Sequence, residues 1–152
     1  MKKIALLIAV AALSLSADTI IQSINVGANA STLNSKSGTG WNVGYGGSKY
    51  YDNGILFGVD FNYDSIEIDG IKNEGMGSDV KIGYSYNKKI GVYAIGTGTY
   101  FNEDVGFGYG AGIEYLPFKH LGVAIDYKTI SMQSQANNYD LDTVKAYLKI
   151  MF

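Results

Sequence analysis

Apolar residues alternate with small or polar residues along most of the chain from residue 24 to residue 152. Phe57, Val59, Phe61 and Tyr63, for example, are separated by glycine, aspartate and asparagine. A period of two is typical of a β-strand with one apolar face. Eight segments of this kind follow one another, which predicts an all-β chain: 24–30, 39–48, 55–64, 78–86, 90–101, 105–115, 121–128 and 143–152.

The connections between these segments are of two kinds. Compact turns are expected at 50–54, 87–89 and 116–120, whereas the polar stretches 31–38 and 131–140 are expected to be longer loops. Asp69-Gly70 predicts a type I′ hairpin turn. Pairing Ile68 with Ile71 across it keeps the apolar faces of both strands aligned, so we expect a ribbon that projects beyond the rest of the sheet. Such an up-and-down order of eight strands fits a closed antiparallel barrel.

The phase of segment 90–101 is ambiguous, because both of its faces carry apolar and small residues. The other segments place their glycines on the face opposite to the aromatic residues, so the preferred phase turns Ile90, Val92, Ala94, Gly96 and Gly98 inward. The alternative turns Gly91, Tyr93, Ile95, Thr97 and Thr99 inward.

Side-chain volume indicates which face of the barrel is outside. The interior of an eight-stranded barrel is filled by ordinary side chains, so the many aromatic residues of the apolar phase would overfill it. A soluble protein would aggregate through such an exposed band, whereas a membrane solvates it. A soluble lipocalin-like binder is the less favoured alternative. The aromatic residues expected to face lipid or to form the interfacial girdles are Trp41, Tyr45, Phe57, Phe61, Tyr63, Tyr84, Tyr86, Phe107, Tyr109, Tyr115, Tyr127 and Phe152.

The N-terminal stretch reads as a secretory signal peptide. Lys2 and Lys3 precede the apolar run 4–13, and small residues follow up to Ala17. The run is too short for a membrane-spanning helix, which needs roughly 20 apolar residues. We therefore expect residues 1–17 to be the signal peptide and 18–152 to be the barrel, with cleavage after Ala17 favoured over cleavage after Ser16.

The composition narrows the function classes further. Twenty Gly and one Pro suit a chain with many strands, and the absence of Cys excludes a disulfide framework and a lipid-modified cysteine anchor. All 12 basic residues are Lys. Removing Lys2 and Lys3 leaves 10 lysines against 14 acids, a net charge of −4, so nucleic acid is not an expected partner.

The last strand, TVKAYLKIMF, places Val144, Ala146, Leu148 and Ile150 on one face and stops on Phe152. It resembles the C-terminal segment of bacterial outer-membrane barrels, and the whole chain resembles the eight-stranded OmpA/OmpX-type barrels of the outer-membrane β-barrel domain family. This resemblance implies location in the outer membrane of a Gram-negative bacterium, contact with outer-membrane lipid and lipopolysaccharide, and recognition of the last strand by the barrel-insertion machinery. A monomer is expected.

Charged residues occur on the phase opposite to the aromatic residues and are therefore expected inside the barrel. The predicted register sets Asp60 opposite Asp79, with Lys81 one diagonal step from Asp60, where it would offset the repulsion. Unpaired charges are costly in a narrow lumen, so we expect a paired network that acts as a polar plug. Its predicted members are Asp60, Asp64, Asp79, Lys81, Glu114, Asp126, Lys128, Lys145 and Lys149.

The function expected is that of a non-enzymatic outer-membrane barrel with a plugged lumen, which supports envelope integrity or surface interactions through its outer loops. A narrow porin-like channel is the alternative, and a lipid-modifying enzyme is less favoured. The sole histidine, His120, falls in a turn expected on the periplasmic side, away from the outer rim where barrel enzymes act. No spacing resembles a metal site, so no catalytic, cofactor-binding or metal-ligating residue is assigned.

Overall fold

The computed structural model describes residues 20–33, 35–102, 104–133 and 138–152. The predicted signal peptide, residues 1–17, lies outside the described residues. No helix long and apolar enough to cross a membrane occurs in the described part of the chain.

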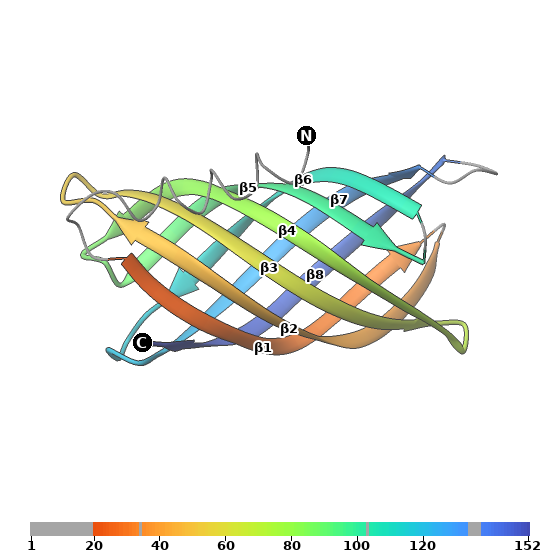
Figure 1. Cartoon of the computed structure of the whole chain (residues 1–152), viewed down its shortest axis with the longest axis horizontal. Helices are drawn as coiled ribbons and strands as arrows, with labels where there is room; N and C mark the ends of the chain where they lie inside the picture. The colour runs from red at the N-terminus through yellow and green to blue at the C-terminus, as the bar shows by residue number, and fades with distance from the viewer. Residues whose placement is uncertain (1–19, 34, 103, 134–137) are drawn as a thin grey trace, which may run out of the picture.

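The described residues form a closed barrel of eight antiparallel strands, each hydrogen-bonded to its neighbours in sequence, with the first strand paired to the last (Figure 1). Closure leaves no free sheet edge around the barrel, so the backbone groups are paired with each other. The predicted fold class is therefore confirmed. The strands are β1 (Ile20–Leu33), β2 (Lys36–Tyr50), β3 (Ile55–Ile68), β4 (Ile71–Tyr86), β5 (Ile90–Phe101), β6 (Asp104–Tyr115), β7 (Leu121–Gln133) and β8 (Asn138–Met151).

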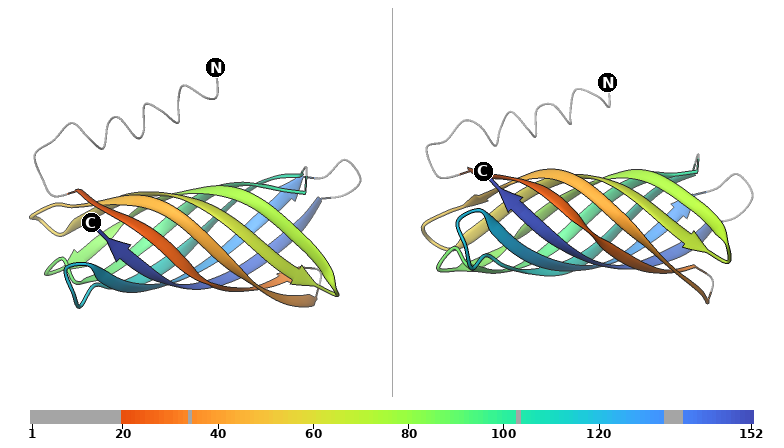
Figure 2. Two further views of the ribbon diagram at one scale, coloured as in Figure 1. Left: turned by 60° about the horizontal axis from the view of Figure 1, so that its bottom comes forward. Right: turned by 90° about the horizontal axis from the view of Figure 1, so that it is seen from below.

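The strands are longer at one end than the alternation predicts. Residues 31–38 and 131–140, expected as loops, mostly continue β1, β2, β7 and β8. Alternation does not predict these strand ends, because polar residues predominate on both faces there and only single apolar residues such as Met132 face the interior. Ser31 Oγ, for instance, lies 2.9 Å from Thr143 Oγ1 inside the barrel. Figure 2 shows the β3–β4 connection at this end of the barrel, which we call the hairpin end, and the C-terminus at the opposite end, which we call the turn end.

The β3–β4 hairpin follows the predicted register. Ile68 pairs with Ile71 and Val59 with Val80. Asp69 and Gly70 have positive φ angles of 53° and 74°, as a type I′ turn requires. The register is therefore confirmed, but the hairpin does not project beyond the rest of the sheet, because β3 stays paired with β2 up to Ile68, which lies opposite Gly38.

The preferred phase of β5 was wrong. Tyr93 and Ile95 are buried inside the barrel, with exposed fractions of 4% and 3%, whereas Val92 is 52% exposed on the outer surface. Glycine was a poor guide to the interior in this strand, because Gly96 and Gly98 face outward, opposite Tyr109 and Phe107 of β6 in the register. The inward residues are those of the alternative phase: Gly91, Tyr93, Ile95, Thr97 and Thr99.

An apolar belt covers the outside of the barrel. Tyr109 and Phe107 are 74% and 63% exposed, and Phe57, Phe61 and Tyr63 are partly exposed on the same outward phase. The other aromatic side chains predicted for this face are also exposed: Trp41, Tyr45, Tyr84, Tyr86, Tyr115, Tyr127 and Phe152. A continuous belt of this kind is stable in hydrocarbon rather than in water, so the fold is that of a membrane-spanning barrel.

Candidate functional site: the barrel interior

The interior of the barrel is layered along its axis. An apolar cluster lies near each end, and charged and polar side chains occupy the length between them. All nine charged residues predicted for the interior are buried there: Asp60, Asp64, Asp79, Lys81, Glu114, Asp126, Lys128, Lys145 and Lys149.

Lys81 on β4 is the centre of the largest charged group. Its Nζ lies 2.6 Å from Asp60 Oδ2 and 3.3 Å from Asp126 Oδ2, and it donates a hydrogen bond of 2.7 Å to the Tyr147 hydroxyl. An ammonium has three N–H groups, so these three acceptors satisfy it completely. The Tyr93 ring also lies under the ammonium, 4.7 Å from Nζ to the ring centroid.

Asp126 accepts two further hydrogen bonds, both from tyrosine hydroxyls. Tyr93 donates to Oδ1 at 2.7 Å and Tyr147 donates to Oδ2 at 2.9 Å. The predicted interior set has five carboxylates against four ammonium groups. The two hydroxyl donors help to stabilise the charge of Asp126, which shares the Lys81 ammonium with Asp60.

Lys149 forms a second group toward the turn end. Its Nζ lies 2.7 Å from Glu114 Oε2, and Glu114 Oε1 accepts a hydrogen bond of 2.6 Å from the Tyr50 hydroxyl. Both carboxylate oxygens therefore have a donor. Tyr50 also belongs to the apolar cluster at this end and joins the charged layer to it.

Two further pairs lie toward the hairpin end. Lys128 Nζ donates to both oxygens of Asp79, at 2.9 and 2.8 Å, and Asn62 Nδ2 donates to the same carboxylate at 2.8 Å. Lys145 Nζ lies 2.7 Å from Asp64 Oδ2. Each of the four predicted interior lysines thus has a carboxylate partner, which a buried ammonium requires.

The apolar clusters close the charged layer from both sides. Leu56, Tyr93, Leu116 and Met151 are among the buried residues at the turn end. Ile66, Ile68, Phe101, Ile130, Met132 and Leu141 form the cluster at the hairpin end. The alternation does not predict these clusters, because a single apolar residue on the polar phase looks like an exception to the pattern. Several such residues occur near both ends of the strands, and together they could have indicated the clusters.

Two small cavities lie between these side chains. A cavity beside Asp64, Thr97 and Lys145 has a volume of about 10 Å³, and one beside Phe101 and Met132 has about 30 Å³. One water molecule needs roughly 10–15 Å³, so these cavities take about one or two waters and no larger solute.

Four polar atoms of the inner wall are less well satisfied. Asn25 Nδ2 and Asn29 Oδ1 on β1, Asn42 Nδ2 on β2 and Ser85 Oγ on β4 are buried without a hydrogen-bond partner among the described residues. Asn25 pairs with Gly44 and Asn42 with Gly27, so the two amides are diagonal neighbours over small residues. Buried polar groups of this kind are usually satisfied by water.

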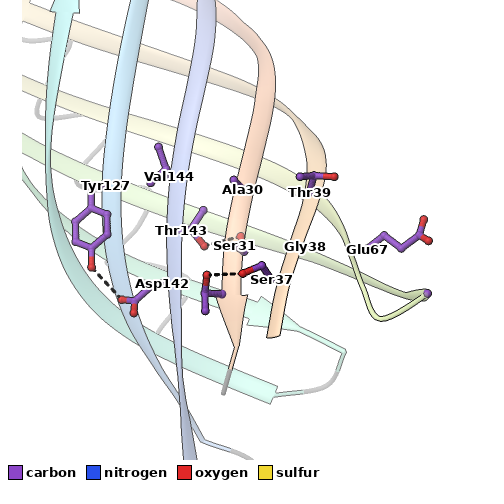
Figure 3. A pocket seen from close by; sticks show the side chains of 12 residues that line it. Ala30, Ser31, Ser37, Gly38, Thr39, Glu67, Tyr127, Asp142, Thr143 and Val144 are labelled. Carbon is purple, nitrogen blue, oxygen red and sulfur yellow. Dashed lines mark hydrogen bonds between the residues drawn. The ribbon is translucent and has the colours of Figure 1, made fainter. Parts of the chain in front are cut away.

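The sole histidine of the chain does not belong to the interior charge network. His120 lies in the β6–β7 connection at the turn end, where its Nδ1 is 3.1 Å from the carbonyl oxygen of Met151. The described residues contain no group of three side chains arranged to hold a metal ion. The arrangement therefore pairs the charges of the interior. At the hairpin end, Ser131 Oγ and Thr129 Oγ1 donate hydrogen bonds to Asp140 and Asp142, at 2.7 and 2.6 Å, whereas His120 lies at the other end. Figure 3 shows Asp142 near the hairpin end, where it also accepts a hydrogen bond of 3.2 Å from Tyr127.

Charges at the hairpin end form local pairs on the surface. Lys36 Nζ lies 2.6 Å from Asp69 Oδ2, and Lys72 Nζ lies 2.6 Å from Glu74 Oε1. The Asp69 carboxylate raises the pKa of the Lys36 ammonium by hydrogen bonding and by its charge. The first of these pairs connects the β1–β2 hairpin to the tip of the β3–β4 hairpin.

Together, the belt and the filled interior define the class of small membrane-spanning β-barrels. No protein-family model matches the chain, and no curated protein is similar to it in sequence at a significant level. Solved structures show the same fold. The Yersinia pestis attachment invasion locus protein, Ail, aligns with a TM-score of 0.57 and 15% identity over 87% of this chain and 98% of its own.

Two further barrels are similar. Neisserial surface protein A, NspA, aligns with a TM-score of 0.56 and 9% identity over 90% of this chain and 100% of its own. A transmembrane β-barrel designed de novo aligns with a TM-score of 0.58 and 12% identity over 90% of this chain and 98% of its own. At these identities the similarity establishes the fold, which is that of the small bacterial outer-membrane barrels.

Proposed function

We propose that the protein is a non-enzymatic barrel of the outer membrane of a Gram-negative bacterium, with a closed lumen. Its barrel anchors the outer hairpins, which support envelope integrity or surface interactions. The observation that carries the proposal is the combination of an apolar belt outside with four interior lysines, each paired with a carboxylate, between two apolar clusters. Such an interior is suited to holding a barrel shut rather than to passing solutes.

The proposed location and partners agree with the sequence features at both ends of the chain. A signal peptide at residues 1–17 would direct the chain across the inner membrane, and the terminal strand would be read by the insertion machinery. The belt would contact outer-membrane lipid, and the rim would contact lipopolysaccharide. Both similar natural barrels are described as surface or attachment proteins, which favours a role at the cell surface.

Planar-bilayer conductance of the refolded protein tests the closed lumen. The wild type is expected to give no discrete current steps, because its cavities are too small for a hydrated ion. The double variant Tyr93→Ala/Tyr147→Ala removes two large interior side chains but leaves the apolar cluster at the hairpin end in place, so it is also expected to stay closed. Steps from the wild type that change in amplitude in Lys149→Ala or Asp126→Ala would contradict the proposal.

A narrow channel is the second candidate, and one observation favours it. The unpartnered polar atoms of Asn25, Asn42 and Ser85 indicate places for water in the interior. A line of such waters would provide a path for protons or small ions if the apolar ends opened. The same conductance measurement distinguishes this candidate from the closed barrel.

A further inference from the structure

The β2–β3 connection, residues 51–54 at the turn end, contains the only asparagine of the chain that is followed by glycine, Asn53 before Gly54. Asn53 is exposed, so water reaches its side-chain amide. In such a pair the main-chain nitrogen of the second residue can attack the side-chain carbonyl carbon of the first, because glycine has no side chain to block the approach. The pair is therefore able to react without an enzyme.

The reaction needs water as its only co-reactant. The Gly54 nitrogen loses its proton and forms a bond to Asn53 Cγ, the Cγ–Nδ2 bond breaks, and Nδ2 leaves with that proton as ammonia. The product is a succinimide ring. Addition of water at Cγ then opens the ring to aspartate. Addition of water at the main-chain carbonyl carbon opens it to isoaspartate, in which the main chain runs through Cβ and Cγ.

In the folded barrel the two reacting groups are held by other hydrogen bonds. The Gly54 N–H, which must lose its proton, donates to the Tyr51 carbonyl oxygen at 3.0 Å. Asn53 Oδ1 accepts a hydrogen bond of 3.1 Å from the Ile55 N–H, an interaction typical of asparagine in turns. These bonds keep the nitrogen and the amide in the conformation of the turn, so they slow the attack.

Further hydrogen bonds make opening of the turn costly. The Tyr51 N–H donates to the Ile55 carbonyl oxygen at 2.9 Å, and the Ser85 N–H on β4 donates to the Gly54 carbonyl oxygen at 2.7 Å. The turn therefore opens only when contacts among β2, β3 and β4 are lost. Opening of a segment held in this way is rare in a folded protein, whereas an unfolded chain samples the reactive conformation freely.

We propose that Asn53 is a modification site that is protected while the barrel is closed and is converted to aspartate and isoaspartate in chains whose β2–β3 turn is open. Isoaspartate adds one carbon atom to the main chain inside the short connection 51–54, so the hydrogen bonds from Tyr51 to Gly54 and Ile55 no longer fit. The modification therefore marks chains that have not closed and then hinders their closure. The inference needs only the closed barrel and does not depend on the proposed function.

The rate of conversion tests the protection. Protein folded in phosphatidylcholine vesicles and protein unfolded in urea are kept at the same mildly alkaline pH, and fragmentation mass spectrometry locates each amide that has become a carboxyl group. Conversion at Asn53 is expected to be several-fold slower in the folded sample. Asn102, which is also exposed but is followed by Glu103, is expected to stay largely unconverted in both samples. Equal rates at Asn53 overturn the protection, and no conversion in urea overturns the site.

Refolding tests the effect on closure. Wild type and Asn53→Gln, which keeps an amide at this position but extends it by one methylene, are aged in urea and then refolded into vesicles. The aged wild type is expected to give a several-fold smaller folded fraction, measured as the fraction with heat-modifiable gel mobility, than the aged variant. Fresh Asn53→Asp, which has the carboxylate on a normal main chain, is expected to fold like fresh wild type. Equal folded fractions for both aged proteins, or poor folding of Asn53→Asp, overturn the effect of the lengthened main chain.

Discussion

At the scale of single residues, the Lys81 ammonium holds together the most crowded part of the interior. Its side chain is 2% exposed and lies between Asp60 and Asp126, which come from β3 and β7. The alternation in the sequence and the Asp69-Gly70 register were sufficient to predict that Lys81 approaches Asp60. The approach of Asp126 could not be predicted, because it depends on which distant strands face each other across the closed lumen.

Lys81→Met is expected to destabilise the barrel by about 3–5 kcal/mol, because it leaves two buried carboxylates without their ammonium partner. Urea unfolding in lipid vesicles measures the change. The double variant Asp60→Asn/Lys81→Met is expected to recover part of the loss, since Asp126 keeps its two tyrosine donors. A double variant less stable than the sum of the two single changes would show that the pair is not the cause.

Gly112 on β6 provides the space for Tyr93. A Cβ atom at this position would lie 2.8 Å from Tyr93 Cζ and would also collide with the Asp126 carboxylate. Gly112→Ala is therefore expected to cost about 1–3 kcal/mol in the same unfolding measurement.

The matched control is Gly96→Ala on the outward face of β5, where an added Cβ has no neighbouring atom within 4 Å. Its effect is expected to stay within about 0.5 kcal/mol. Similar costs for the two substitutions would mean that the loss comes from the change of glycine in a strand and not from the interior contact.

At the scale of elements, β5 shows where local pattern is insufficient. Both of its faces carry apolar residues, so periodicity does not decide which face is inside. The inner face is decided by partners from other strands: Tyr93 reaches Asp126 on β7, and Ile95 packs in the cluster at the turn end. The β3–β4 hairpin is the opposite case, because a two-residue turn and its flanking pairs set the register locally.

The observed phase of β5 predicts the environment of labels along it. The chain has no Cys, so single cysteines can carry a nitroxide directly. A label at Ala94→Cys is expected to be accessible to oxygen dissolved in lipid, whereas a label at Thr97→Cys is expected to be shielded from both oxygen and water-soluble relaxants. Reversed accessibility in power-saturation electron paramagnetic resonance would show that the strand has the other phase.

At the scale of the whole molecule, closure of the barrel holds the apolar outer surface and the filled interior together in one stable structure. Pairing of β1 with β8 satisfies the backbone, the belt contacts hydrocarbon, and the ion pairs and apolar clusters fill the lumen. Opening the barrel would leave the backbone groups of β1 and β8 unpaired, and it would remove the belt and the interior side chains from the surroundings that stabilise them. Unfolding is therefore expected to require the whole barrel to open.

Heat-modifiable gel mobility checks this cooperative closure. The membrane-extracted protein is expected to migrate at a different apparent size before and after boiling in dodecyl sulfate, because the closed barrel resists the detergent until it is heated. Identical mobility in both samples would contradict a closed barrel. Loss of the shift at a lower temperature in Lys81→Met than in Gly96→Ala would connect the interior network to this resistance.

The sequence alone determined the strand count, the up-and-down order, the β3–β4 register and the outward position of the aromatic residues, because alternation, turn residues and side-chain volume act locally or as totals. Tertiary structure decided the phase of β5, the length of the polar strand ends, the apolar clusters and the pairing of each interior charge. These depend on which side chains meet across the lumen, and only closure of the barrel brings residues so distant in the chain within hydrogen-bonding distance.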